Sequence, residues 1–239
     1  MLLIERRSKM KVTWLTQAGL LFENDRISIM VDPYLSDSVG ETLDENKHRR
    51  IEVCEKYLTV HPDVLIITHD HLDHLDPETL EHILDTDKKI TVIAPYNAYK
   101  RLLSFGRGHN YVLLDPHSVW SQQNVTFYAV KAAHSDLTAA GYIIDDGTKT
   151  YYVTGDTLYN YDTIDDVLEL VEDGVDYCFL PINGVGNNMN GKDAADFAYE
   201  INAKHAIPLH YGLFDSIEPT EVFDFEDAVI LMPYQQFSL

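Results

Sequence analysis

The amino-acid sequence predicts an α+β fold of the αββα type, in which two mixed β-sheets pack face to face and helices cover their outer faces. Two observations predict this arrangement. The chain begins with short strand-like segments in direct succession and then alternates strands with helices. Its second half starts again in the same style, with consecutive strands followed by alternating strands and helices. This order, repeated twice, predicts two packed sheets.

In the first half, short apolar runs bounded by turn residues predict the strands. The polar stretch 36–50 is predicted to be a mobile loop. Asp76-Pro77-Glu78 begins a helix, with Asp76 as the N-cap and Pro77 at the first helical position. The predicted strands are Val12–Thr16, Leu20–Glu23, Ile27–Asp32, Asp63–Thr68, Ile90–Ala94 and Tyr111–Leu114, and two more predicted helices are Glu52–Leu58 and Asn97–Ser104.

In the second half, the segment 161–174 predicts an amphipathic helix, because Ile164, Val167 and Val171 recur at helical spacing. Its acidic residues then form a solvated face and not a calcium site. A later helix, capped by Asp193, is predicted to run to residue 203, and a third begins at Pro219. The predicted strands are Val125–Lys131, Ala140–Asp145, Thr150–Thr154, Tyr177–Pro181 and Ala206–Leu209.

Length and composition limit the class of protein. The 239 residues suffice for one large domain, 1–239, in which residues 1–9 are predicted to be a loose N-terminal extension. The net charge of −21 disfavours nucleic acid and anionic membranes as partners. Two distant cysteines suit a reducing compartment, and no apolar run approaches the ~20 residues of a membrane span. We therefore expect a cytoplasmic protein that acts on a small molecule.

Histidine and aspartate are concentrated directly after one predicted strand. Residues 68–76 read Thr-His-Asp-His-Leu-Asp-His-Leu-Asp and follow the apolar run 63–67. Imidazole and carboxylate groups bind divalent metals, and gathering them without a cation costs desolvation and charge repulsion. The run therefore predicts a metal site that serves catalysis.

Three more candidate ligands stand at the ends of predicted strands in the second half. They are His134, Asp156 and His210. Gly155, directly before Asp156, would let the backbone pass close to a neighbouring group. One histidine at a strand end is more often a packed or solvated residue. Four such strand ends in one chain instead favour a shared site on a rigid scaffold.

The signature His-x-His-x-Asp-His at residues 69–74, followed by these three residues, resembles the metallo-β-lactamase superfamily. The resemblance extends over nearly the whole chain from Met10 onward and implies the four-layer αββα sandwich. It also implies a dinuclear metal site in which Asp156 bridges two ions. One ion would bind His69, His71 and His134, and the other would bind Asp73, His74 and His210.

Two further aspartates fall near this signature. Val31-Asp32-Pro33 matches an early aspartate that supports the site from behind in the superfamily. Asp70 alternates with His69 and His71, points elsewhere, and is assigned a supporting or structural role. His134-Ser135-Asp136 and the segments at 154–157, 181–184 and 210–211 resemble the branch that contains bacterial ascorbate-phosphate lactonase.

The metals and the reaction follow from the ligand types. Five imidazoles favour zinc, and two carboxylates leave room for manganese or iron as Mn²⁺ or Fe²⁺. Two ions about 3.5–4 Å apart would share a bridging hydroxide that attacks the substrate. Asp73 and Asp156 are the predicted catalytic carboxylates, with Asp73 orienting the nucleophile and shuttling its proton. Redox-active di-iron relatives carry a glutamate where this sequence has His71, so the resemblance implies hydrolysis.

Substrate-binding residues are predicted on the loop 183–191 and beside the last ligand. Asn183 and Asn187 would donate amide hydrogens to a polar substrate, although a solvent loop is an equally good interpretation. Tyr211, next to His210, could donate to a developing oxyanion, and a packed tyrosine is almost as good an interpretation.

Three functions remain open on this basis. The first is hydrolysis of a small ester or lactone, including a sugar-derived lactone as in the lactonase branch. The second is a phosphodiesterase that uses the same metals on a small cyclic nucleotide or phospholipid-type substrate. The third is a metal-binding scaffold without catalysis. The lactonase resemblance also implies a homo-oligomer.

Overall fold

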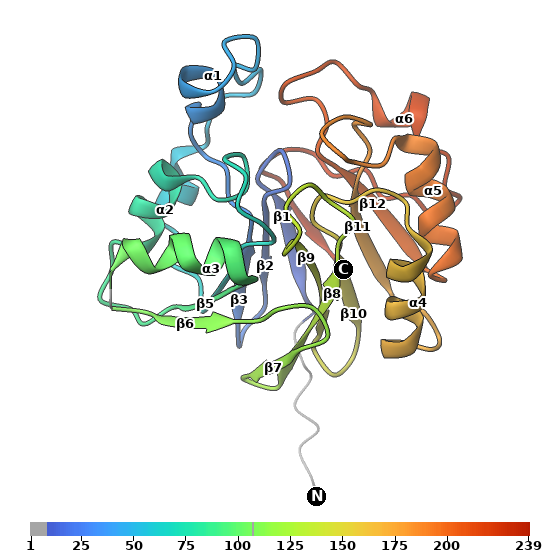
Figure 1. Ribbon diagram of the computed structural model, residues 1–239, viewed down its shortest axis with the longest axis horizontal. Coiled ribbons are helices and arrows are strands. Elements are labelled where there is room, and N and C mark those ends of the chain that lie inside the picture. The colour runs from blue at the N-terminus through green and yellow to red at the C-terminus, as the bar shows by residue number, and fades with distance from the viewer. Residues whose placement is uncertain (1–8, 107) are drawn as a thin grey trace, which may run out of the picture.

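Two β-sheets pack face to face in the computed structural model, which describes residues 9–106 and 108–239 (Figure 1). The first sheet has the strand order β13-β1-β2-β3-β4-β5-β6. Its pairing is antiparallel from β13 to β3 and parallel from β3 to β6. The strands are β1 Lys11–Trp14, β2 Leu20–Glu23, β3 Ser28–Val31, β4 Val64–Ile66, β5 Thr91–Ala94, β6 Asn110–Leu113 and β13 Gln236–Ser238.

The second sheet has the order β12-β11-β10-β9-β8-β7. It is antiparallel from β7 to β10 and parallel from β10 to β12. Both sheets are therefore mixed, as predicted. The strands are β7 Val119–Gln122, β8 Val125–Lys131, β9 Ala140–Asp145, β10 Thr150–Val153, β11 Tyr177–Pro181 and β12 His205–Leu209.

Helices cover the outer faces of both sheets, which confirms the αββα sandwich (Figure 1). On the first sheet, Leu80 and Ile83 of α2 belong to one buried cluster with Leu65 of β4. On the second sheet, α4 and α5 occupy the outer side (Figure 1). The helices are α1 Ser38–Thr42, α2 Pro77–Leu84, α3 Tyr96–Leu102, α4 Tyr161–Leu170, α5 Gly191–Glu200 and α6 Pro219–Val222, with 3₁₀ turns at η1 Glu55–Thr59 and η2 Leu103–Phe105.

The main core lies between the two sheets. The ring of Phe22 on β2 lies 5.2 Å from that of Phe179 on β11 and 5.8 Å from that of Tyr151 on β10. All three side chains are buried. Burial of large aromatic side chains contributes strongly to stability. The strands that end near the predicted ligands are therefore held rigidly.

Some predicted elements were wrong in detail. The stretch 36–50 contains α1, and the guanidinium of Arg49 ties it to the carbonyls of Tyr34 and Ser36 at 2.9 and 3.3 Å. The predicted helix 52–58 is the shorter turn η1, and β7 and β13 were not predicted. Asp193 does not cap α5. Asn190 does so, because its side chain accepts a hydrogen bond from the backbone NH of Asp193 at 3.0 Å.

Most of the predicted N-terminal extension falls on residues 1–8, which lie outside the described residues. Across the part of the chain that the structure describes, no helix is both long and apolar enough to cross a membrane.

Candidate metal centre

The loop after β4 carries four of the seven predicted ligands. It starts where β4 ends at Ile66 and stops where α2 begins at Pro77. The carboxylate of Asp76 accepts a hydrogen bond from the backbone NH of Thr79 at 3.3 Å, so the predicted N-cap is confirmed. The loop is thus fixed at both ends by regular structure. The ligands on it are His69, His71, Asp73 and His74.

Six of the predicted ligands meet in two adjoining groups of three. Within each group the candidate ligand atoms all lie within 4.8 Å of one another. The rings of His69 and His74, one from each group, have centroids 4.0 Å apart, so the groups share one site. The imidazole group consists of His69, His71 and His134. The mixed group consists of Asp73, His74 and His210.

Asp156, the seventh predicted ligand, lies against the mixed group. Its Oδ1 is 3.3 Å from Nε2 of His74, and its Oδ2 is 3.3 Å from Nε2 of His210. Its charge also acts on His69 and His134 of the imidazole group. The carboxylate is buried. Its predicted bridging of two ions stays a prediction.

Gly155 places Asp156 by bringing its strand end close to the ligand loop. Its φ is +61°, a left-handed backbone, and a Cβ at this position would lie 2.8 Å from Cβ of Thr68. Glycine avoids both the backbone strain and the collision. The predicted close approach at Gly155 is therefore confirmed.

Asp32 supports the site from behind, in the place predicted for it. Its carboxylate lies 2.8 Å from Nδ1 of His74, and both groups are fully buried. It also accepts hydrogen bonds from the backbone NH and the hydroxyl of Thr68, at 2.8 and 2.5 Å. A carboxylate on one ring nitrogen fixes the tautomer and turns the other nitrogen toward the site.

The pKa values of His69 in the imidazole group and of His74 and His210 in the mixed group shift in opposite directions. Burial and the nearby charge of His74 hold the pKa of His69 well below its ordinary value. Burial alone would also lower the pKa of His74, but the carboxylates of Asp156 and Asp32 raise it well above that value. Against the effect of burial, Asp156 and Asp73 raise the pKa of His210 to about 9. Burial raises the pKa of Asp156 itself, yet His210 and His74 hold it well below its ordinary value.

Three buried polar atoms at the centre of the cluster have no hydrogen-bond partner among the described residues. They are Nε2 of His69, Nε2 of His74 and Oδ1 of Asp156. An unpartnered buried polar atom costs free energy, which a coordinated cation removes. Imidazole nitrogens with carboxylate oxygens are a donor set for Zn²⁺, Mn²⁺ or Fe²⁺. The residues present therefore fit divalent metal ions.

Gln17 belongs to the site, although the sequence did not reveal it. Its Nε2 donates to Oδ2 of Asp73 at 2.9 Å and lies 3.2 Å from both ring nitrogens of His210. It follows β1 in a tight turn and is 1% exposed. A polar residue between two predicted strands gives no sequence signal for such a contact, because it depends on residues far along the chain.

The predicted substrate residues have different positions. Nδ2 of Asn183 lies 2.9 Å from Nδ1 of His210, and its Oδ1 is buried without a partner. The backbone carbonyl of Asn187 accepts from Nδ1 of His134 at 3.3 Å, while its side chain is exposed. Tyr211 lies in the core, with its ring 5.0 Å from that of Trp14. Its described contacts therefore favour a packed tyrosine over an oxyanion donor.

Asp70 has structural contacts and lies in neither group of ligands. Its backbone NH donates to the carboxylate of Asp136 at 3.3 Å, and its backbone carbonyl accepts from the guanidinium of Arg101 on α3. Burial and the Asp136 carboxylate raise the pKa of Asp70. These contacts hold the ligand loop between His69 and His71.

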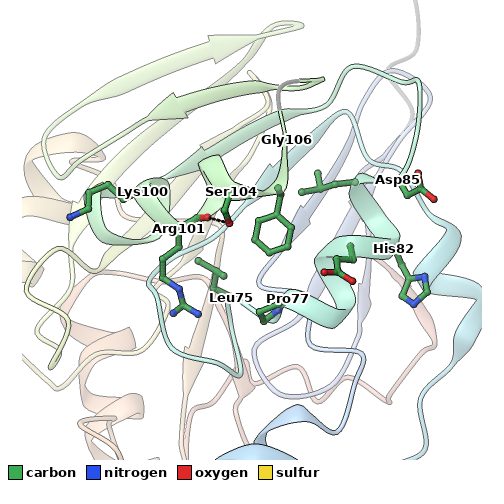
Figure 2. Close-up of a pocket in the computed structure, with 11 residues that line it drawn as sticks. Leu75, Pro77, His82, Asp85, Lys100, Arg101, Ser104 and Gly106 are labelled. Carbon is green, nitrogen blue, oxygen red and sulfur yellow. Dashed lines mark hydrogen bonds between the residues drawn. The ribbon is translucent and has the colours of Figure 1, made fainter.

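Two cavities lie near these elements. A cavity of about 1050 Å³ opens between α2 and α3, and Figure 2 shows Lys100, Arg101 and His82 around it. None of the seven predicted ligands, all of them described residues, lines it. A second cavity of about 370 Å³ borders the site at His134 and includes Leu137 in its lining. Of these two cavities, the second is the one that a predicted ligand lines.

The fold and the ligand cluster define a class of protein: an αββα sandwich with a histidine–aspartate metal site at one edge of its sheets. The chain belongs to the beta-lactamase superfamily domain family, which matches residues 28–211. Over 215 residues it is 26% identical to a UPF0173 metal-dependent hydrolase of Exiguobacterium, covering 87% of this chain and 89% of that protein. Over 229 residues it is 29% identical to one of Staphylococcus saprophyticus, covering 87% and 89%.

A solved structure shows the same fold. It is Igni18, described as a metallo hydrolase from Ignicoccus hospitalis, with a TM-score of 0.71 at 20% identity over 97% of this chain and 100% of that one. The comparisons confirm the predicted superfamily and the class of metal-dependent hydrolases to which these relatives are assigned. They do not confirm the lactonase branch, the identity of the metal or the number of ions, which stay predictions.

Proposed function

We propose that the chain is a dinuclear metallohydrolase that cleaves a small ester or lactone. One observation carries this proposal: two adjoining groups of three candidate ligands, with the buried carboxylate of Asp156 beside His74 and His210 of the mixed group. A single ion would use only half of these donors. Zinc is the first candidate metal, followed by manganese and iron, because five of the seven donors are imidazoles.

The chain's residues have separable roles in this reaction. Bound divalent ions would supply an acidified water as nucleophile and polarise the oxygen of the substrate. Asp73 is the most accessible carboxylate of the site, with 20% of its side chain exposed. Burial would raise the pKa of Asp73, but His74 and His210 hold it far below its ordinary value, so it stays ionised. It can therefore orient the nucleophile by accepting a hydrogen bond from it, whereas so low a pKa makes it a poor acceptor of the proton itself.

The cavity beside His134 supports a small and largely uncharged substrate. Its volume of about 370 Å³ lies in the range of small-molecule sites. Leu137 and Leu158 give it apolar surface, and Leu137 is 85% exposed. Its lining sets Lys131 against Asp162 and Asp166, so a phosphate group would meet little positive charge apart from that of the bound ions. This favours a neutral ester or lactone over a phosphorylated substrate.

The lactonase resemblance makes sugar-derived lactones the first substrates to test. Protein freed of metal with a chelator would be reloaded with zinc, manganese or iron. Each form would then be assayed on lactones, carboxylic esters, thioesters and phosphodiesters. We expect turnover of lactones or esters that depends on the metal and falls to background in the metal-free protein.

Other outcomes would overturn this proposal in defined ways. Turnover of phosphodiesters alone would establish the phosphodiesterase, the second candidate on the same metals. A fully loaded protein that is inert on every substrate class would favour the non-catalytic scaffold. Elemental analysis of the same samples gives the number of ions per chain, and one ion at full activity would contradict the dinuclear site.

A further inference from the structure

The turn that follows β1 has a left-handed backbone. Thr16 and Gln17 have φ values of 74° and 49°, so two successive residues other than glycine are left-handed. Left-handed backbone is strained for such residues and persists only where surrounding contacts enforce it. Strain of this kind occurs frequently at functional sites. The left-handed turn is therefore a candidate for positioning groups of the site.

Hydrogen bonds from four directions hold this turn in place. The carbonyl of Thr16 accepts from the NH of Gly19 at 2.8 Å, and its hydroxyl accepts from the guanidinium of Arg49 at 3.0 Å. The carbonyl of Gln17 accepts from the indole of Trp14 at 2.9 Å and from the backbone NH of His210 at 3.0 Å. The turn thereby joins the end of β1 in the first sheet to the end of β12 in the second.

The side chain of Gln17 reaches the mixed group. Its amide nitrogen donates to Oδ2 of Asp73 at 2.9 Å, and this same oxygen lies 3.2 Å from Nε2 of His210. The amide also lies against the ring of His210 and is buried. An apolar residue would fill this volume equally well, so burying an amide there indicates a need for its hydrogen bond.

We propose that Gln17 is a positioning residue that holds Asp73 and His210 in the geometry required by the second metal ion. The inference rests on the dinuclear site of the proposed function. Asp73 comes from a loop and is partly exposed, so its carboxylate needs an anchor to stay directed inward. Gln17 supplies that anchor from the opposite side of the site. The imidazole group has no contact with Gln17 among the described residues.

The test is to remove the amide while keeping the volume. Gln17→Met retains a side chain of similar size, and Gln17→Asn keeps an amide too short to reach Asp73 on a residue that tolerates left-handed backbone. Gln123→Met is the matched control, because Gln123 also has a left-handed φ of 51° but is exposed in the turn between β7 and β8. Stepwise zinc affinities would be measured by competition with a chelator, and the visible spectrum of the cobalt-loaded protein would report on each ion's geometry.

We expect the affinity for one ion to fall about 10- to 100-fold in both Gln17 variants, as is usual when the support of a metal ligand is lost. The affinity for the other ion and both affinities in Gln123→Met should stay within about twofold of the wild type. In the background Asp73→Ala, Gln17→Met should have a smaller effect than in the wild type, since contacting residues in one network are non-additive and only the contact with His210 remains.

Three results would overturn the inference. They are unchanged affinities in both Gln17 variants, an equal loss at both ions, or additive effects of Gln17→Met and Asp73→Ala. An equal loss would mark a purely structural residue. Failure of the proposed function looks different: the wild type itself would bind fewer than two ions. No assay of hydrolysis is needed to tell these results apart.

Discussion

The imidazole group and the mixed group adjoin each other, but the protein supports them differently. His69 is fully buried, and its Nε2 has no partner among the described residues. The mixed group instead contains its own counter-charges, because His210 lies 3.2 Å from Asp73 and 3.3 Å from Asp156. His74 has Asp32 behind it at 2.8 Å.

This difference predicts how each half takes up a cation. The raised pKa values of His74 and His210 favour imidazolium charges beside the buried carboxylates in the metal-free protein, while Nε2 of His74 and Oδ1 of Asp156 have no hydrogen-bond partner among the described residues. The depressed pKa of His69 leaves its imidazole neutral and ready to bind. A first ion should therefore enter the imidazole group directly, whereas an ion in the mixed group must displace protons.

The largest expected effect follows from removing Asp156, the residue predicted to bridge the two ions. Asp156→Ala should lower the metal content to one ion or none per chain. Hydrolytic activity should fall by more than the roughly 100-fold loss expected when a residue that only supports a metal ligand is replaced. Asp136→Ala is the matched control, because Asp136 is 6% exposed against 5% for Asp156 and lies outside both groups. Elemental analysis distinguishes them. Full occupancy in Asp156→Ala would contradict its bridging position.

The second prediction concerns pH and separates the two groups. Against burial, Asp156 and Asp73 raise the pKa of His210 to about 9, so at pH 7 an ion entering the mixed group must displace its proton. If binding of that ion releases one proton, its affinity should fall about tenfold for each pH unit below 9, and each further proton released adds another factor of about ten per pH unit. The affinity for the ion of the imidazole group should be nearly constant near pH 7. Calorimetry in buffers of different ionisation enthalpy counts the released protons.

The same shift affects the stability of the metal-free protein. The stabilisation due to the raised pKa of His210 is complete below its ordinary value of 6.5 and is lost as the pH rises through about 9. Urea unfolding of the metal-free protein should therefore show declining stability between these limits. A flat profile, with no proton release on metal binding, would show that the two groups do not differ in this way.

Much of the fold was predictable because most strands are apolar runs that are buried. The strands that were missed, β7 and β13, consist mainly of exposed residues and give no burial pattern. The short helix α1 buries Ser38, Val39 and Gly40, a composition that predicts no helix, so tertiary contacts decide its formation. Asn190 and Asp193 are both good capping residues, and sequence alone does not choose between them.

The ligands were predictable for a related reason: each follows a buried strand, and the ends of neighbouring strands meet. Gln17 was not predictable, because it contacts Asp73 and His210 across 56 and 193 residues of sequence and through a left-handed turn. Tyr211 shows the opposite case. Proximity to His210 in sequence predicted a role in the site, but its ring packs against Trp14.

The third prediction tests the support behind the mixed group. Asp32→Asn removes the charge next to Nδ1 of His74 and should weaken the binding of one ion about 10- to 100-fold, leaving the other nearly unchanged. Asp37→Asn is the control, since Asp37 forms a similar pair with His48 at 2.6 Å on the surface, where 56% of the histidine side chain is exposed. Chelator competition measures both. An equal loss at both ions in Asp32→Asn would show that the two groups act as one unit.

The smallest effect on metal binding is expected at Gly155, and it should not distinguish the two groups. Gly155→Ala should lower the free energy of unfolding by roughly 1–2 kcal/mol through strain in the left-handed backbone. It should lower it by about 1–3 kcal/mol more because the new Cβ would lie 2.8 Å from Cβ of Thr68. Gly186→Ala, at a φ of +68° with no atom within 4 Å of the new Cβ, should show only the first loss. The difference between the two variants in free energy of unfolding, measured with urea, gives the cost of the collision with Thr68. Because Asp156 follows Gly155 and is predicted to bridge the two ions, any loss of affinity should fall on both ions alike, and a selective loss would show that Asp156 serves only one group.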